Sequence, residues 1–284
     1  MCCANFYEQD IVQELMGGSF HPGGLGLSRK VVENLALSPG QTVLDVACGV
    51  GTTTRMMADE FGLAATGLDY SEINVQKARS GADAAANSTE PCCAPGEPCC
   101  TPELATLGGS ADANATKGSV KFMQGSAAAI ELEDESFAGL TCECAVSTFA
   151  DQTAVAKEFF RVLKPGGVFA MTDMVVNAKL PDDFSEKAAP WTCVAKALSL
   201  DGYQQLFEQA GFESVKREDH SHTLLELATE MKRKLVMAGM GKALGALPDL
   251  GMNLREMRAM LTQSTELVKA ESIQYGLLLF KKPA

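Results

Sequence analysis

The feature that most constrains the fold of this chain is the stretch QTVLDVACGVGTTTR at residues 41–55. A short apolar strand, Val43–Asp45, runs into a turn of small residues at positions 47–51, and a helix is predicted over Thr52–Phe61. A unit of this kind directs free backbone N–H groups and the positive end of a helix toward a ligand above the carboxyl end of the strand. The sequence therefore predicts an α/β domain with a ligand site at this turn.

The charge around this turn indicates the kind of ligand. Asp45 ends the first strand just before the glycines, where a negative pyrophosphate would be repelled, and the third glycine of the dinucleotide fingerprint is missing. Asp69 follows 24 residues later and ends a second apolar strand, Ala65–Asp69, at the position where a carboxylate commonly binds a ribose diol. These residues predict a ligand that is cationic near Asp45 and carries a ribose. We expect S-adenosyl-L-methionine, with S-adenosyl-L-homocysteine as product.

Four segments in the same order resemble the class I S-adenosylmethionine-dependent methyltransferases. The matching segments are Val43–Gly51, Gly67–Ser71, Phe122–Ala127 and Arg161–Gly167. The resemblance implies a Rossmann-like, doubly wound, seven-stranded and mostly parallel sheet with an antiparallel last strand, plus N-terminal and C-terminal helical additions. One departure is Ala47, where the family usually has a glycine. The predicted cofactor-binding residues are Asp45, Cys48, Gly49, Gly51, Asp69, Tyr70, Ser126, Ala127 and Cys142.

The chain divides into a core with additions. Residues 1–37 are predicted to form a helical lid segment, residues 38–222 the core, residues 223–270 a helical cap and residues 271–284 the final strand. In the lid segment we expect a helix over residues 28–36 with Ser28 as its N-cap. His21 lies in the glycine-rich loop before that helix, and a loop-packing or surface role is favoured over a role as base or ligand.

A segment poor in large apolar residues, Gly81–Gly118, interrupts the core and is predicted to be a mobile surface insertion. It contains two adjacent-cysteine pairs, which offer four soft ligands for a metal or a thiophilic metalloid. Adjacent cysteines are not the usual zinc spacing, so a redox-labile loop without a fixed ligand is an equal alternative. The candidate metal ligands are Cys92, Cys93, Cys99 and Cys100.

A strand predicted over residues 137–146 carries the run Cys142-Glu143-Cys144 near its carboxyl end. Because side chains alternate along a strand, we expect the two cysteines on one face and Glu143 on the other. Cys142 is a candidate for the ligand crevice and for catalysis, and Cys144 is expected to be a small core residue.

Composition excludes several function classes. The net charge of −12 argues against a nucleic-acid partner, because phosphate binding depends on clusters of Lys and Arg. No run of eighteen apolar residues is present, which predicts no membrane span. No secretory leader is recognisable at residues 1–10, so we expect a cytoplasmic protein whose ten cysteines are reduced or ligand-binding.

The acceptor of the methyl group is predicted from the shortage of bases and the abundance of thiols. Only three histidines are present, and a thiolate or a metalloid lone pair needs less base assistance than a hydroxyl. The segment Trp191–Leu198, with the helix that follows, resembles the part of arsenite methyltransferases that supplies an arsenic-binding cysteine, and that cysteine maps onto Cys193. We therefore expect a small, thiophilic acceptor, in particular trivalent arsenic, with Cys193 and Cys142 as the catalytic candidates. The alternatives are a small organic acceptor and a non-catalytic module that binds S-adenosylmethionine or a metal.

Overall fold

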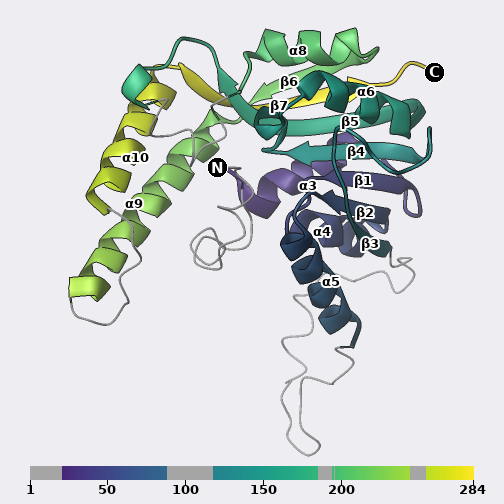
Figure 1. Ribbon diagram of the computed structural model, residues 1–284, viewed down its shortest axis with the longest axis horizontal. Helices are drawn as coiled ribbons and strands as arrows, with labels where there is room; N and C mark the ends of the chain where they lie inside the picture. Colours follow the sequence, from purple (N-terminus) through teal and green to yellow (C-terminus); the bar gives the residue numbers. More distant parts are fainter. Residues whose placement is uncertain (1–20, 88–117, 185–193, 195, 244–253) are drawn as a thin grey trace, which may run out of the picture.

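The computed structural model describes residues 21–87, 118–184, 194, 196–243 and 254–284. One seven-stranded sheet forms its centre, with the strand order β3-β2-β1-β4-β5-β7-β6 (Figure 1). The first five strands pair in parallel, whereas β7 pairs antiparallel with both β5 and β6. The predicted Rossmann-like sheet with an antiparallel last strand is confirmed.

The strands agree closely with the expected ranges at the two ends of the chain and less closely in the middle. The final strand lies within the predicted residues 271–284, while β4 ends at Glu143, three residues earlier than expected. The physical reason is that Cys144 has a φ of 53°, which turns the chain out of the extended conformation. The strands are β1 Thr42–Val46, β2 Ala64–Asp69, β3 Ser119–Gln124, β4 Phe137–Glu143, β5 Leu163–Val176, β6 Glu213–Asp219 and β7 Ile273–Lys281.

The helices include one correction that affects the site. The helix of the lid segment begins at Gly24, so the prediction of Ser28 as its N-cap is wrong: Ser28 is a fully buried residue inside that helix. The helix after β2 continues to Asn87, into the start of the predicted insertion, and residues 88–117 lie outside the described part. The helices are α3 Gly24–Asn34, α4 Thr52–Phe61, α5 Glu72–Asn87, the 3₁₀ turn η1 Val146–Thr148, α6 Gln152–Val162, α8 Leu200–Gln209, α9 Ser221–Ala243 and α10 Leu254–Lys269.

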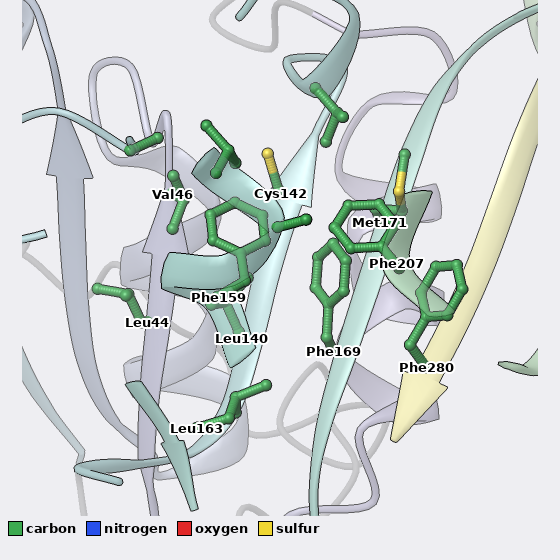
Figure 2. Close-up of a cluster of buried hydrophobic side chains, with 14 of the residues drawn as sticks. Leu44, Val46, Leu140, Cys142, Phe159, Leu163, Phe169, Met171, Phe207 and Phe280 are labelled. Atoms are coloured by element: carbon green, nitrogen blue, oxygen red, sulfur yellow. The ribbon is translucent and has the colours of Figure 1, made fainter. Parts of the chain in front are cut away.

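Hydrophobic clusters cover both faces of the sheet, because successive strand residues point to opposite sides. On one face, aromatic rings from α6, α8 and two strands pack edge to face and stacked, as Figure 2 shows for Phe159, Phe169, Phe207 and Phe280. The ring centroids of Phe169 and Phe207 are 4.8 Å apart. On the other face, α3 and α4 pack against the neighbouring positions of the same strands. Burial of these side chains supplies the main stabilisation of the sheet.

The helices α9 and α10 pack against each other and against β7 at one side of the molecule (Figure 1). They contribute none of the described residues that line the cavity introduced below. Their role as a cap over the substrate stays a prediction. Within the described residues, no helix combines the length and the hydrophobicity needed to cross a membrane.

Candidate functional site

A cavity of about 530 Å³ opens at the carboxyl ends of β1, β2 and β4. Its walls come from the small-residue turn after β1, the start of α4, residues 125–128 and the segment that connects η1 to α6. Parallel strands place their carboxyl ends at one edge of the sheet, and this edge is where open α/β sheets bind ligands. The position agrees with the ligand site expected from the turn at residues 47–51.

The Asp69 carboxylate lines the cavity and is held by two backbone N–H groups. Its Oδ2 atom accepts a hydrogen bond from the backbone N–H of Gly49 at 2.8 Å, and its Oδ1 atom accepts one from Ser71 at 2.9 Å. The first bond joins the end of β2 to the turn after β1, and the second orders the residues that follow β2. A carboxylate held in this way is suited to accept hydrogen bonds from two adjacent hydroxyl groups.

Asp45 lies deeper, at the end of β1. Its carboxylate accepts hydrogen bonds from the hydroxyls of Thr54 at 2.6 Å and Thr141 at 3.0 Å. Burial raises its pKa to about 7, although the Thr54 hydrogen bond acts in the opposite direction. A cation bound in the cavity would favour the ionised form of this group.

The turn between β1 and α4 is left-handed at several positions. Ala47 has a φ of 60°, so the place where the family usually has glycine does require a conformation that glycine adopts more readily. Gly51 has a φ of 79°, and a Cβ atom there would lie 2.4 Å from the ring of Phe122. Gly51 is therefore needed for the packing of Phe122 beneath the turn, and it does not line the cavity.

Most of the predicted cofactor-binding residues reach this cavity. Gly51 and Cys142 are the exceptions. Binding by the residues that do reach it stays a prediction. The predicted residues that line the cavity are Asp45, Cys48, Gly49, Asp69, Tyr70, Ser126 and Ala127.

Cys142 in β4 and Cys144 just after it lie in the opposite places from those expected: Cys142 is in the core and Cys144 is at the cavity. Cys142 is fully buried in the aromatic face of the core, and burial raises the pKa of its thiol well above the usual range, which keeps it protonated. Cys144 follows the end of the strand, packs beside the opposite cluster and lines the cavity. The predictions that the two cysteines share a face and that Cys142 reaches the ligand crevice are wrong, because the positive φ of Cys144 ends the alternation.

A polar network at the cavity was not identified from the sequence. The carboxylate of Glu143 accepts hydrogen bonds from Ser28 at 3.0 and 3.1 Å and from Thr53 at 3.0 Å. The Nε2 atom of His21 lies 3.6 Å from Glu143 Oε2 and 3.1 Å from Ser28 Oγ. The alternation along β4 places Glu143 opposite Cys142, but nothing local in the sequence shows that His21 and Ser28 meet it.

The remaining cysteine predictions fall elsewhere. Cys92, Cys93, Cys99, Cys100 and Cys193 lie outside the described residues, so their assignments stay predictions. The described residues contain no group of three or more His, Cys, Asp or Glu side chains that would hold a metal ion.

Known proteins resemble the chain over the elements that form the cavity. Two family models, each described as a methyltransferase domain, match residues 43–98 and 109–211.

Two curated relatives act on different acceptors. An arsenite methyltransferase of Halobacterium salinarum is 28% identical over 213 residues, which is 74% of this chain and 46% of that protein. Phosphoethanolamine N-methyltransferase 3 of Arabidopsis thaliana is 27% identical over 224 residues, covering 77% of this chain and 37% of that protein. The chain thus spans less than half the length of these relatives.

Among solved structures, phosphoethanolamine N-methyltransferase 2 of Haemonchus contortus, in complex with phosphomonomethylethanolamine and S-adenosylhomocysteine, superposes with a TM-score of 0.73. It is 17% identical, and the match covers 99% of this chain and 58% of that one. At this identity the similarity supports the fold.

Proposed function

The chain belongs to the class I S-adenosylmethionine-dependent methyltransferases, and we propose that it transfers the methyl group of S-adenosylmethionine to a small-molecule acceptor bound in the cavity above β1, β2 and β4. The observation that carries this proposal is the pair of carboxylates at the ends of adjacent strands. Asp69 is held by two backbone N–H groups of the surrounding turns, and Asp45 lies beside the turn after β1. No Lys or Arg is found among the described residues that line the cavity, which suits a cationic cofactor.

The cofactor supplies a methyl group on a positively charged sulfur, and the protein has to align it with the acceptor and exclude water. In this arrangement Asp69 would accept hydrogen bonds from the ribose hydroxyls, and Asp45 would balance positive charge near the turn. Tyr70, with residues 125–128, would form the adenine side of the site. Calorimetric titration with S-adenosylhomocysteine tests this assignment, and binding of NAD or ATP in its place would contradict it.

We further propose that the acceptor is thiophilic, in particular trivalent arsenic, with Cys193 as one of the groups that hold it. Two described thiols, Cys48 and Cys144, line the cavity, and an arsenite methyltransferase is among the relatives. The side chain of Lys196, three residues after Cys193, lies 3.4 Å from the backbone oxygen of Ala150, a residue of the cavity wall. Lys196 therefore contacts the wall of the site.

The test is methyl transfer from labelled S-adenosylmethionine to arsenite, followed by mass spectrometry. Cys193→Ser should abolish the methylated arsenic product and leave the affinity for S-adenosylhomocysteine unchanged, because the thiol is assigned to the acceptor. Unchanged turnover of arsenite in this variant would contradict the arsenic proposal.

One observation favours a second acceptor class, a small organic molecule with a hydroxyl or amine group. Methylation at such a group needs a positioned base, and the cavity presents both Glu143 and His21. Transfer to a catechol, with no product from arsenite and no effect of Cys193→Ser, would identify this class. If S-adenosylhomocysteine binds but no acceptor is methylated, a non-catalytic binding module is indicated.

A further inference from the structure

We propose that His21 and Glu143 form a proton-accepting pair for the methyl transfer, and that the acceptor therefore carries an ionisable proton on or next to its attacking atom. This inference rests on the proposed function above. It identifies the residues that act on the acceptor, where the preceding section dealt with the cofactor.

Both groups are shielded from water and face the same cavity. The side chain of Glu143 is 6% exposed and that of His21 is 9% exposed, and both residues line the cavity wall. Glu143 stands at the carboxyl end of β4, and His21 precedes the first residue of α3 by three positions. A carboxylate next to an imidazole, both largely buried, is a common arrangement for proton transfer.

The hydrogen bonds of His21 define what its ring can accept. Its Nδ1 atom lies 3.1 Å from the backbone oxygen of Pro22, which can only accept, so Nδ1 carries a hydrogen. The Nε2 atom is then the position that gains or loses a proton. It lies 3.1 Å from Ser28 Oγ and 3.6 Å from Glu143 Oε2.

Ser28 connects the two groups but has only one proton to donate. In the neutral ring, this hydroxyl can donate to Nε2 or to Glu143, but not to both. Once Nε2 is protonated, the ring donates to Ser28 Oγ and the Ser28 hydroxyl donates to the carboxylate. The network therefore gains a hydrogen bond when it receives a proton, and the imidazolium lies next to a negative charge.

Hydrogen bonds from two helices, α3 and α4, hold the Glu143 carboxylate of the pair in place. Ser28 is fully buried in α3, and Thr53, in the first turn of α4, donates to Glu143 Oε1 at 3.0 Å. Glu143 is thereby held before any acceptor enters. Preorganisation of this kind lowers the reorganisation needed when charge appears in the transition state.

The charge of the cavity limits the class of acceptor. Its described lining contains four carboxylates, from Asp45, Asp69, Glu143 and Asp151, together with His21 and without Lys or Arg. An anionic acceptor such as a phosphomonoester would be repelled. The pair thus fits an acceptor that is neutral before transfer and has an O–H, N–H or S–H group, and arsenous acid, As(OH)₃, is one such molecule.

The chemical step balances without a further reactant. The lone pair of the attacking atom forms a bond to the methyl carbon, and the bond from that carbon to sulfur breaks with its electron pair moving to sulfur. The proton on the attacking atom moves to His21 Nε2 and is later released to solvent. When the attacking atom is arsenic, the proton leaves a hydroxyl bound to it as the As=O bond forms, and the two electrons that arsenic gives up form the new As–C bond.

Besides His21, other titratable groups interact electrostatically with Glu143. They are Asp45 from β1, Cys142, which points to the opposite face of β4, and Tyr275 from β7. Burial raises the pKa of the Cys142 thiol and the Tyr275 hydroxyl well above their usual ranges, so both stay neutral near pH 7. The pKa of Asp45 is about 7, and it is lowered by His21 and raised by Glu143. Its ionisation therefore shifts in the variants of either residue, and the rescue by imidazole separates that shift from loss of the His21 ring.

The experiment compares His21→Asn, Glu143→Gln and the control His222→Asn, which alters an exposed histidine in α9. The rate of transfer from labelled S-adenosylmethionine to arsenite and to catechol is measured between about pH 6 and about pH 9. His21→Asn should lower the rate about 100-fold near neutral pH, and the loss should shrink as pH rises because the acceptor ionises without assistance. Added imidazole should restore part of the rate, and His222→Asn should behave as the unaltered protein.

Affinity for S-adenosylhomocysteine separates catalysis from folding, and it should change by less than about twofold in both variants of the pair. The inference is overturned if His21→Asn keeps its rate, or if its loss is the same at every pH and imidazole restores nothing. If Glu143→Gln does not fold, Ser28→Ala takes its place, and a normal pH profile in that variant would also count against the pair. If the unaltered protein methylates neither acceptor nor any other on a panel, the proposed function fails and this inference fails with it.

Discussion

Replacement of Gly51 tests how the turn after β1 is built. Its φ of 79° is left-handed, and a Cβ atom at this position would lie 2.4 and 2.5 Å from two ring carbons of Phe122 and 3.1 Å from a guanidinium nitrogen of Arg55. Arg55 in turn donates to the backbone oxygen of Val50 in the turn and lies 5.5 Å from the centre of the Phe122 ring. Gly51→Ala should therefore displace Phe122 and disturb the turn.

The expected loss of stability has two parts. A left-handed backbone costs an L-residue about 1–2 kcal/mol, and forcing a methyl group into an occupied space costs about 1–3 kcal/mol more. Gly40 offers a matched control, since its φ is 84° and no atom would lie within 4 Å of a new Cβ. Gly40→Ala should lose only the first part, and the change in the unfolded state is the same for both variants. The difference between them should be about 1–3 kcal/mol.

Urea unfolding of the unaltered protein and the two variants gives this difference from the midpoints, provided that the m values agree. Titration with S-adenosylhomocysteine, measured in parallel, should show weaker binding for Gly51→Ala alone. Equal destabilisation by the two substitutions would refute the packing argument and would leave backbone conformation as the whole reason for glycine at position 51.

Three further predictions concern the cavity and the core. Asp69→Ala should weaken binding of S-adenosylhomocysteine about 10-fold to 100-fold, because charged hydrogen bonds contribute about 1.5–3 kcal/mol, and calorimetry with an unchanged affinity would contradict the role of this carboxylate. Burial raises the pKa of Asp45 and Asp173 to about 7 from the usual 3.8, so the folded protein holds protons that the unfolded chain releases between these values. The stabilisation from these protons is complete below the lower pKa and is lost as the pH rises to about 7. The urea concentration at the unfolding midpoint should therefore decrease when the pH is raised from about 5 to about 7. An increase over this interval would be inconsistent with protonated carboxyl groups. Phe169→Ala should lower the free energy of unfolding by about 3–5 kcal/mol and Phe169→Leu by considerably less, because the fully buried ring contacts Phe207 and Phe280. Equal losses for the two variants in differential scanning calorimetry would argue against this cluster as the centre of the core.

The parts of the fold that can be predicted are those determined by residues close together in the sequence. The helix α4 is predicted at its observed bounds, and β7 lies within the segment predicted for the final strand, because a glycine turn and a long apolar run mark these elements directly. Asp45 and Asp69 were placed at the cavity because each ends a strand whose direction the fold class fixes.

The parts that could not be predicted depend on backbone conformation or on distant contacts. The start of α3 was missed because Gly23 takes a left-handed conformation that leads the chain into the helix at Gly24. The partner of Ser28 was missed because Glu143 lies 115 residues away in the sequence. The reversal of Cys142 and Cys144 follows from one positive φ angle, for which the residue type gives no signal.

The position of β7 between β5 and β6 has a consequence for biosynthesis. Until residues 273–281 have left the ribosome, β6 has no neighbour to pair with and the ring of Phe280 is absent from its place beside Phe169 and Phe207. The nascent chain therefore exposes an unpaired strand edge and part of its aromatic core throughout the synthesis of α9 and α10. The interior of this sheet is completed only after translation has passed Lys281.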